Sequence, residues 1–97
     1  MVKIEWSILA LKDASGIVEY ISEDTPDAAL KLFHHIKNKV DRLPDHPKLY
    51  KPGREPRTRE MVVTDNYIVV YRESEALITI LRVLHAAQKM ALESKKE

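Results

Sequence analysis

The sequence contains no cysteine, which excludes a disulfide framework and any metal site built on thiolates. It also lacks an apolar run near the roughly 18 residues that a membrane-spanning helix requires. Its start, MVKIEW, has no apolar core of the kind found in signal peptides. Glycine is scarce, with two residues in 97, and aromatic residues make up 6%. These absences predict a cytoplasmic protein without a membrane partner.

Hydrophobic residues make up 44% of the chain and charged residues 32%, the balance of a globular protein rather than a disordered one. At this length a single domain spanning residues 1–97 is expected. The net charge is only +1, but residues 48–59 form a basic cluster. It consists of Lys48, Lys51, Arg54, Arg57 and Arg59 against the single acid Glu55. Such a cluster fits an acidic partner or a phosphate backbone, although a solvated loop explains the same composition.

The N-terminal part of the sequence predicts a short strand followed by a helix. Val2, Ile4 and Trp6 alternate with polar residues, which is the period of a half-buried strand. Ser7 is a typical helix N-cap, and apolar residues then recur at spacings of three and four to about residue 22. This face consists of Ala10, Ala14, Ile17, Val18 and Ile21. Gly16 interrupts the helix at a cost of about 1 kcal/mol relative to alanine.

A second helix is predicted to begin with Thr25 as its cap, Pro26 at the first helical position and Asp27 in the first turn. The helix should stop before Pro44. Its apolar seam consists of Ala29, Phe33, Ile36, Val40 and Leu43. Because only a few residues separate the two helices, they should form an antiparallel hairpin.

The rest of the chain predicts a loop and a sheet. Residues 44–58 hold four of the five prolines and one of the two glycines, and so predict an irregular loop. Strand-like segments follow at 59–64, 67–72 and 76–85, with connections short enough for an antiparallel meander. Residues 86–97 predict a short, partly exposed helix. The predicted fold is α+β, with a helical hairpin covering one face of an antiparallel sheet of about four strands.

A lone arginine, Arg82, interrupts the apolar run ALITILRVLH of the last predicted strand. Strict alternation would place Arg82 and Ile80 on one face and His85 on the other. Since the helices can cover only one face, the other would stay apolar with a charged margin, which favours docking of another chain. The alternative is an internal ion pair between Arg82 and Glu60 on a neighbouring strand.

The sequence contains no standard catalytic motif: it has no glycine-rich phosphate loop, no HExxH and no nucleophile elbow. His34 and His35 are adjacent on a helix and therefore point in different directions, which makes them poor joint metal ligands. No metal and no cofactor is expected. Any catalysis would have to rest on Arg, Lys, His and Tyr side chains, which can bind and cleave a phosphodiester without a metal.

The chain contains, in this order, the segments KIEWS, ALKDASGIVEYI, TPDAAL, TREMVV, YIVVYR and ILRVLH followed by AAQK. Together they resemble the RelE/ParE superfamily, the toxins of type II toxin–antitoxin modules, over nearly the full length. The resemblance implies a helical hairpin packed on a curved antiparallel sheet. It also implies a small cognate antitoxin, often DNA-binding, that wraps the toxin and neutralises it. Operator DNA would then be reached only through the antitoxin.

Two branches of this superfamily imply different targets. RelE-like members are ribosome-dependent ribonucleases that cut messenger RNA, whereas ParE-like members inhibit DNA gyrase and generally lack the nuclease residues. This chain has Ile68 where RelE has a catalytic arginine, and Ala86, Ala87 and Leu92 where RelE has basic residues and a tyrosine. The ILRVLH ending is closer to ParE-type sequences, although many relatives have tryptophan where Met90 stands. The resemblance therefore favours a ParE-like gyrase inhibitor that is not an enzyme.

A ribosome-dependent mRNA interferase is the alternative, and a non-toxic binding module on the same fold is a third hypothesis. In the interferase, His85 would act as general acid or base, since histidine titrates near neutrality. Arg59, Arg72 and Arg82 would then steady the phosphate. The residues predicted to contact the target or the antitoxin are Lys51, Arg54, Arg57, Arg59, Arg82, His85 and Lys89. An amphipathic segment of the antitoxin is expected to cover the apolar sheet face and its basic margin.

Overall fold

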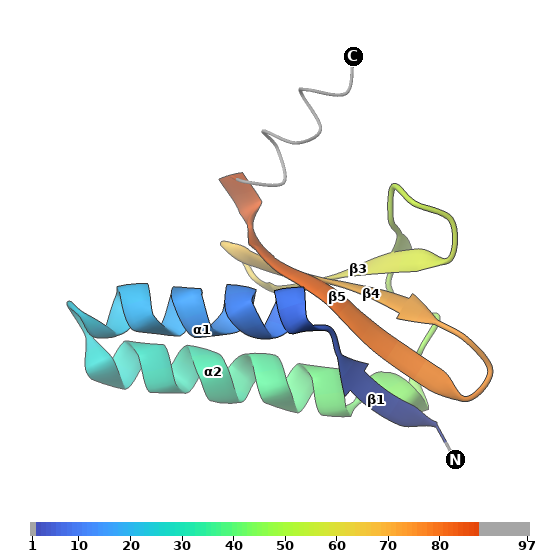
Figure 1. Ribbon diagram of the computed structural model, residues 1–97, viewed down its shortest axis with the longest axis horizontal. Helices are drawn as coiled ribbons and strands as arrows, with labels where there is room; N and C mark the ends of the chain where they lie inside the picture. The colour runs from blue at the N-terminus through green and yellow to red at the C-terminus, as the bar shows by residue number, and fades with distance from the viewer. Residues whose placement is uncertain (1, 88–97) are drawn as a thin grey trace.

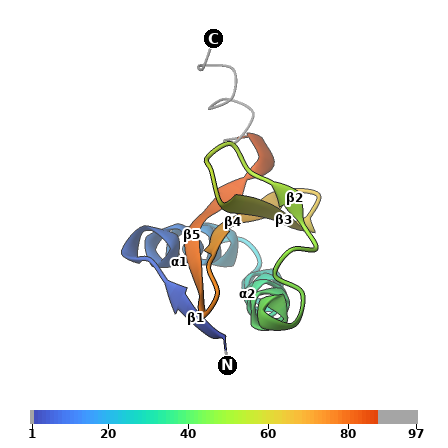
Figure 2. The same cartoon turned by 90° about the vertical axis from the view of Figure 1, so that its right-hand side faces the viewer.

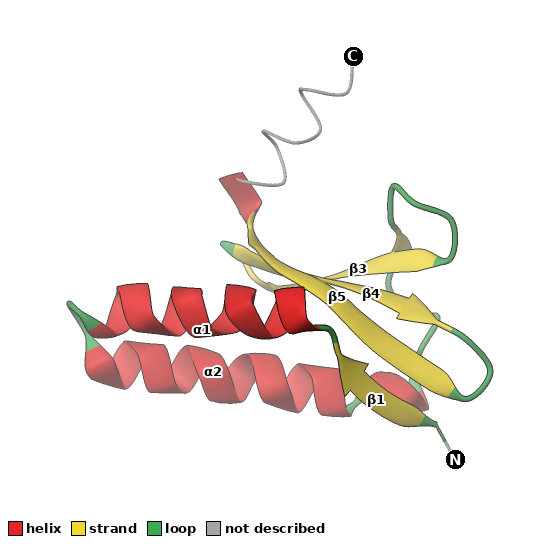
Figure 3. Ribbon diagram, viewed as in Figure 1, coloured by secondary structure: helices red, strands yellow, loops and turns green. Residues whose placement is uncertain are grey.

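The chain folds into two antiparallel helices packed against one face of a five-stranded sheet (Figure 1; Figure 3). This computed structural model describes residues 2–87. The elements are β1 (Lys3–Trp6), α1 (Ile8–Ser22), α2 (Pro26–Asp41), the 3₁₀ turn η1 (Leu43–Asp45), β2 (Lys51–Pro52), β3 (Thr58–Thr64), β4 (Tyr67–Glu73) and β5 (Leu77–His85). Most of the predicted C-terminal helix, including Lys89, lies outside the described residues.

Helix α1 begins at the predicted cap. The Ser7 backbone is extended, and its Oγ accepts the Ala10 N–H at 3.0 Å. The same hydroxyl donates to the Leu81 carbonyl at 3.0 Å and so joins the start of α1 to β5. For α2 the prediction is partly wrong, because the Thr25 side chain makes no capping hydrogen bond. There Pro26, whose backbone already has the helical φ, starts the helix without a side-chain cap.

The sheet has the strand order β1-β5-β4-β3-β2. The predicted α+β architecture and the antiparallel meander of β3, β4 and β5 are confirmed. Two details differ from the prediction. β1 lies parallel to β5, with Lys3 opposite Leu77, and a fifth strand, β2, forms inside the predicted loop (Figure 2). β2 is missed by sequence reasoning because two residues are too few to show a period; they pair with Arg59 and Glu60 of β3.

A bulge in β5 changes which side chains share a face. In the β4–β5 register Leu81 is an extra residue; the pairs on either side of it are Tyr71 with Ile80 and Val70 with Arg82. A bulge resets the alternation of a strand. Ile80 and Val83 therefore both belong to the buried core under the helices, and His85 follows on the side of Val83. The strict alternation predicted for this strand is wrong beyond Ile80.

The core lies between the helices and the sheet. Its fully buried side chains include Ala10, Ile36, Val40 and Leu43 from the helical layer and Met61, Val69, Tyr71, Ile78, Ile80 and Val83 from the sheet. The helical hairpin extends well past the ends of the strands (Figure 1), so its distal half has no sheet beneath it. The predicted seam of α2 is consequently wrong at Phe33, which is 43% exposed. For the same reason Ala10 is the one fully buried residue of α1.

Candidate functional site

Arg82 is held by Asp13 of α1. The arginine Nε donates to Asp13 Oδ2 at 2.7 Å and Nη2 donates to Oδ1 at 3.2 Å, a two-point pairing of guanidinium and carboxylate. This hydrogen bonding raises the pKa of Arg82 above its ordinary value. An internal ion pair is therefore present, but the predicted partner is wrong. Glu60 instead forms an ion pair with Lys51, whose Nζ lies 3.5 Å from Glu60 Oε1.

The Asp13 carboxylate also protects an edge of the sheet. β1 pairs with β5 only as far as Ile80, so no strand within residues 2–87 lies beside the next backbone groups of β5 on that side. Asp13 Oδ2 accepts the Val83 N–H at 3.0 Å, and Ser7 Oγ donates to the Leu81 carbonyl. Two side chains thus take the place of a neighbouring strand. Sequence reasoning missed Asp13, because its contact with β5 spans 69 positions and an acid on a helix ordinarily faces water.

Arg59 fastens the long loop to the sheet. Its Nε donates to Glu73 Oε1 at 3.1 Å, and its Nη1 donates to the Tyr50 carbonyl at 2.8 Å. Beside it, the Tyr71 hydroxyl donates to the Pro47 carbonyl at 2.8 Å. Burial raises the pKa of Tyr71 from 10.0 to about 12, although the nearby Arg59 charge opposes the shift. The guanidinium of Arg59 is thus occupied by the protein's own groups.

The basic loop presents its other cations to solvent. Arg54 and Arg57 are exposed, and neither forms an ion pair within residues 2–87. Arg57 has φ 66, in the left-handed region. Gly53 lies so close to Thr58 that a Cβ at this position would be 2.5 Å from the threonine Oγ1. The loop is therefore shaped by a tight approach that only glycine allows, and it places two arginines on one exposed turn.

His85 lies at the end of β5 beside α1. Its ring meets the ring of Tyr67 edge to face, with centroids 5.2 Å apart at 85°. His85 Nδ1 accepts the Ala87 N–H at 3.0 Å, so in the neutral ring the proton is on Nε2. The histidine lines an open hollow of about 420 Å³ together with Lys12 and Tyr20 of α1. The imidazole of His85 thus shares one hollow with an ammonium group and two phenols.

The sequence-predicted site residues do not gather at one point. Arg59 lies on the same sheet face as the core residues of β3, whereas Arg72 projects from the opposite face. Arg82 is engaged by Asp13, which also lines the hollow beside His85. The residues Lys51, Arg54 and Arg57 form a separate group on the loop, and Lys89 is outside the described residues. The described part of the chain brings no three His, Asp or Glu side chains together to hold a metal ion.

On the sheet face away from the helices, less apolar surface is exposed to solvent than the sequence predicts. Ile68 and Leu84 lie opposite each other on this face, and both are buried. Their neighbour Val62 is 48% exposed. Arg72, also on this face, is exposed. None of the described helices is long and apolar enough to cross a membrane.

Comparison with known solved structures supports the architecture. The chain superimposes on one chain of the structure described as the chromosomal ParDE toxin–antitoxin system from P. aeruginosa. The TM-score is 0.79 and the identity 22%, with 88% of this chain and 96% of the other chain covered. It also superimposes on the E. coli DinJ–YafQ complex with a TM-score of 0.67 and 18% identity, covering 91% and 97%. At these identities the likeness shows a common fold.

Sequence comparison identifies the family. The chain is 41% identical over 88 residues to "Putative toxin Y4kP" of Sinorhizobium fredii, with 90% of this chain and 91% of that protein covered. It is 31% identical over 88 residues to "Toxin RelE2" of Caulobacter vibrioides, with 91% and 99% covered. The model of the family described as "ParE toxin of type II toxin-antitoxin system, parDE" matches residues 4–90. The chain therefore belongs to the ParE toxin family, within the RelE/ParE superfamily of type II toxin–antitoxin toxins.

Proposed function

We propose that this toxin acts as a ParE-like inhibitor of DNA gyrase, works by binding rather than by cutting nucleic acid, and is neutralised by its cognate antitoxin in the cytoplasm. The observation that carries the proposal is the dispersion of the cations that a nuclease would need. Arg59 is committed to Glu73 and loop carbonyls, and Arg82 is committed to Asp13. Arg72 lies on the opposite sheet face from Arg59.

This dispersion matters because metal-free cleavage of a phosphodiester requires several donors aimed at one phosphate, where charge develops in the transition state. A binding protein has no such requirement, since its charged side chains can be spread over a docking surface. The match of residues 4–90 to the ParE family supports the same branch, as does Ile68 in place of the arginine of the nuclease pattern.

The direct test adds the purified toxin to gyrase and plasmid DNA. The expected result is loss of supercoiling or accumulation of cleaved DNA trapped on gyrase, reversed by addition of the antitoxin. The proposal is wrong if gyrase is unaffected while message bound to ribosomes is cut. Absence of growth arrest on induction in bacteria would favour the non-toxic binding module instead.

A ribosome-dependent mRNA interferase is the second candidate, because one observation favours it. His85 is fixed against Tyr67 and has Lys12 nearby in the same hollow, so a proton-transfer group is held in a defined orientation. Under this alternative His85→Ala abolishes message cleavage and leaves the fold intact. Tyr67→Phe, which keeps the ring contact, is the matched control for packing. Unchanged cleavage in His85→Ala excludes the assignment of catalysis to this residue.

For the antitoxin, we propose that an acidic, amphipathic segment covers Val62 on the helix-free sheet face and extends to Arg54 and Arg57 on the basic loop. Two observations support this placement: Val62 is 48% exposed, and Arg54 and Arg57 have no ion-pair partner within residues 2–87. Recognition of this kind adds a strand or helix to a prepared surface. Arg82 contributes less than the sequence suggests, since Asp13 already neutralises it.

A further inference from the structure

β1 is an edge strand whose outer side is open. In the described part of the chain its only strand neighbour is β5, at the end of the sheet opposite to β2 and the basic loop. The Lys3 N–H donates to the Ala76 carbonyl before β5 at 3.0 Å, and the Ser7 N–H donates to β5 at 2.9 Å. Because backbone groups point alternately to the two sides of a strand, those of Ile4 and Trp6 point away from β5. This edge is therefore a template for another strand.

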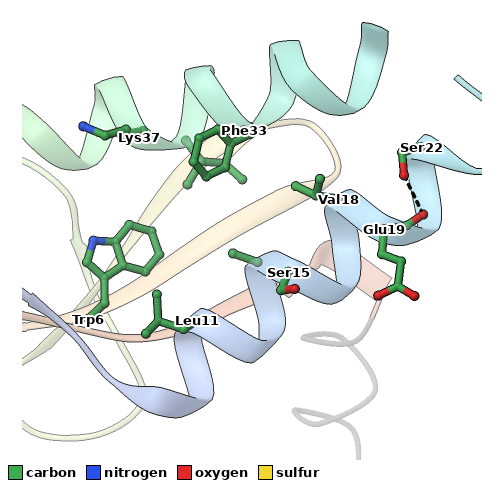
Figure 4. A pocket seen from close by; sticks show the side chains of 10 residues that line it. Trp6, Leu11, Ser15, Val18, Glu19, Ser22, Phe33 and Lys37 are labelled. Carbon is green, nitrogen blue, oxygen red and sulfur yellow. Dashed lines mark hydrogen bonds between the residues drawn. The ribbon is translucent and has the colours of Figure 1, made fainter. Parts of the chain in front are cut away.

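The side chains of β1 are divided between the two faces of the sheet. Ile4 and Trp6 are half-buried and pack against the core. Figure 4 shows the Trp6 side chain on the side of the helices, beside Leu11 of α1. Lys3 and Glu5 alternate with these residues and are exposed on the other face, where neither forms an ion pair in the described part of the chain. The packing of Trp6 thus fixes the direction in which the two charges point.

The sequence VKIEW at this edge is complementary to itself when a second copy runs antiparallel to it. With Ile4 opposite Ile4 of the second copy, Lys3 of each copy faces Glu5 of the other, and oppositely charged cross-strand pairs are stabilising. The backbone groups of Ile4 point across the edge, so the Lys3–Glu5 pairs are the non-hydrogen-bonded ones, in which side chains lie closer together. In the same register the apolar side chain of Val2 faces Trp6.

The charges also exclude the neighbouring registers. A two-fold axis at Lys3 would place the two lysines opposite each other, and an axis at Glu5 would do the same with two glutamates. Like charges in directly opposed positions are destabilising. Lysine on an edge strand ordinarily keeps other strands away, but a glutamate two residues later turns that repulsion into attraction for one partner in one register.

We propose that two copies of this toxin associate through β1, antiparallel about a two-fold axis at Ile4, so that their sheets join into one. The occupant is a second copy because the charged and the apolar residues of one short sequence match that same sequence. β1 has four residues, so the contact is smaller than a standard interface of about 1,600 Å², and the dimer forms at high concentration. It leaves the basic loop free at the other edge of the sheet and does not depend on the target of the toxin.

Sedimentation equilibrium of the full-length toxin without antitoxin, at concentrations up to about 1 mM, measures the association. Glu5→Lys makes both cross-strand charge pairs repulsive and should weaken the dimer by at least about tenfold. Lys3→Glu should have the same effect. Glu23→Lys is the matched control, because it makes the same charge change at an exposed position after α1; its association should equal that of the wild type.

Two combinations test the pairing itself. An equimolar mixture of Glu5→Lys and Lys3→Glu should associate again, since each chain then faces the opposite charge on its partner. The double variant, which exchanges the two charges within one chain, should associate like the wild type. A loss of stability in either single variant would not be repaired by mixing, so recovery is specific to contact between two β1 strands.

Amide hydrogen exchange identifies the edge. The N–H groups of Ile4 and Trp6 should exchange more slowly as the toxin concentration rises, because each gains an acceptor in the second copy. The Lys3 N–H is the internal reference, since it is already bonded to the Ala76 carbonyl in a single copy. In Glu5→Lys the concentration dependence at Ile4 and Trp6 should disappear.

The outcomes separate the possibilities. Absence of association up to about 1 mM, equal weakening in Glu5→Lys and Glu23→Lys, or a mixture that fails to associate overturns the proposal. Protection of the Ile4 and Trp6 N–H groups only after antitoxin is added would assign the edge to the antitoxin and also overturn it. Loss of association in each single variant with recovery in their mixture supports it, whatever the gyrase assay gives.

Discussion

Asp13 on α1 and Arg82 on β5 form a two-point ion pair, with Nε–Oδ2 at 2.7 Å and Nη2–Oδ1 at 3.2 Å, and the same carboxylate accepts the Val83 N–H at 3.0 Å. The Asp13 side chain is 14% exposed and that of Arg82 is 35% exposed. One carboxylate thus satisfies both a guanidinium and an unpaired strand edge. This arrangement explains how an apolar strand tolerates an arginine at its bulge.

Asp13→Ala should lower the free energy of unfolding by about 2–3 kcal/mol, because it removes hydrogen bonds to a charged group and leaves the Val83 N–H without its acceptor. Asp13→Asn should cost less, since the amide oxygen still accepts that N–H. Urea unfolding followed by circular dichroism measures both. The control is Asp41→Asn, which breaks the exposed pair with Lys37 and should cost no more than about 0.5 kcal/mol. Equal effects at the two positions would contradict a structural role for the Asp13 pair.

Tyr71 should make the protein sensitive to alkali. Its pKa is raised by burial from 10.0 to about 12, so the folded state favours the protonated phenol. The resulting stabilisation is fully present below pH 10 and is lost as the pH rises through the interval from 10 to about 12. Over this interval the free energy of unfolding should fall by about 2–3 kcal/mol in total.

Tyr71→Phe removes this titration. The variant should be less stable at neutral pH by about 1 kcal/mol, because the hydrogen bond to the Pro47 carbonyl is lost. Its stability should nevertheless fall less steeply than that of the wild type above pH 10. Tyr20→Phe serves as the control, since Tyr20 is 76% exposed. Parallel pH profiles for the wild type and Tyr71→Phe would show that Tyr71 does not titrate as the structure implies.

The elements that depend on local pattern were predictable from the sequence. Ser7 caps α1 because its short hydroxyl reaches the Ala10 N–H, a relation over three residues. The period of three and four predicted both helices, the period of two predicted β1, and strand-like apolar runs predicted β3 and β4. The short connections gave the hairpins. Each of these inferences needs only neighbouring residues, which is why each survives in the structure.

The features missed are those that depend on distant contacts. The sequence does contain a hint of the bulge at Leu81, because the apolar pairs on both sides of Arg82 break strict alternation. Only the pairing of β5 with β4 shows at which residue the bulge lies. Asp13 has no local signal that separates it from a solvated acid. In the sequence Arg59 looks like any other cation of the basic loop. Only its hydrogen bonds to Glu73 and to the Tyr50 carbonyl show that it holds the loop against the sheet.

Gly16 offers a stabilising substitution in α1. A Cβ at this position would meet nothing within 4 Å, and the residue is inside a helix without a left-handed backbone. Gly16→Ala should therefore raise the free energy of unfolding by about 0.5–1 kcal/mol, through higher helix propensity and a less flexible unfolded chain. Gly53→Ala is the opposite case, because its Cβ would clash with Thr58, and it should destabilise. Thermal unfolding distinguishes the two, and destabilisation by Gly16→Ala would contradict the open space beside α1.

Charge reversal on the basic loop should weaken capture of the antitoxin chiefly through the rate of association. Arg54→Glu with Arg57→Glu removes two exposed cations that have no acidic partner in residues 2–87, so the field that attracts an acidic segment is lost without disturbing the core. Surface plasmon resonance should show association several-fold slower at low salt, with the difference shrinking once the screening length falls below about 10 Å near 0.1 M. Lys3→Glu with Lys31→Glu is the control, because it also reverses two exposed charges, on β1 and α2, away from the loop. If the loop variant and the control behave alike at every ionic strength, the antitoxin does not bind over Arg54 and Arg57.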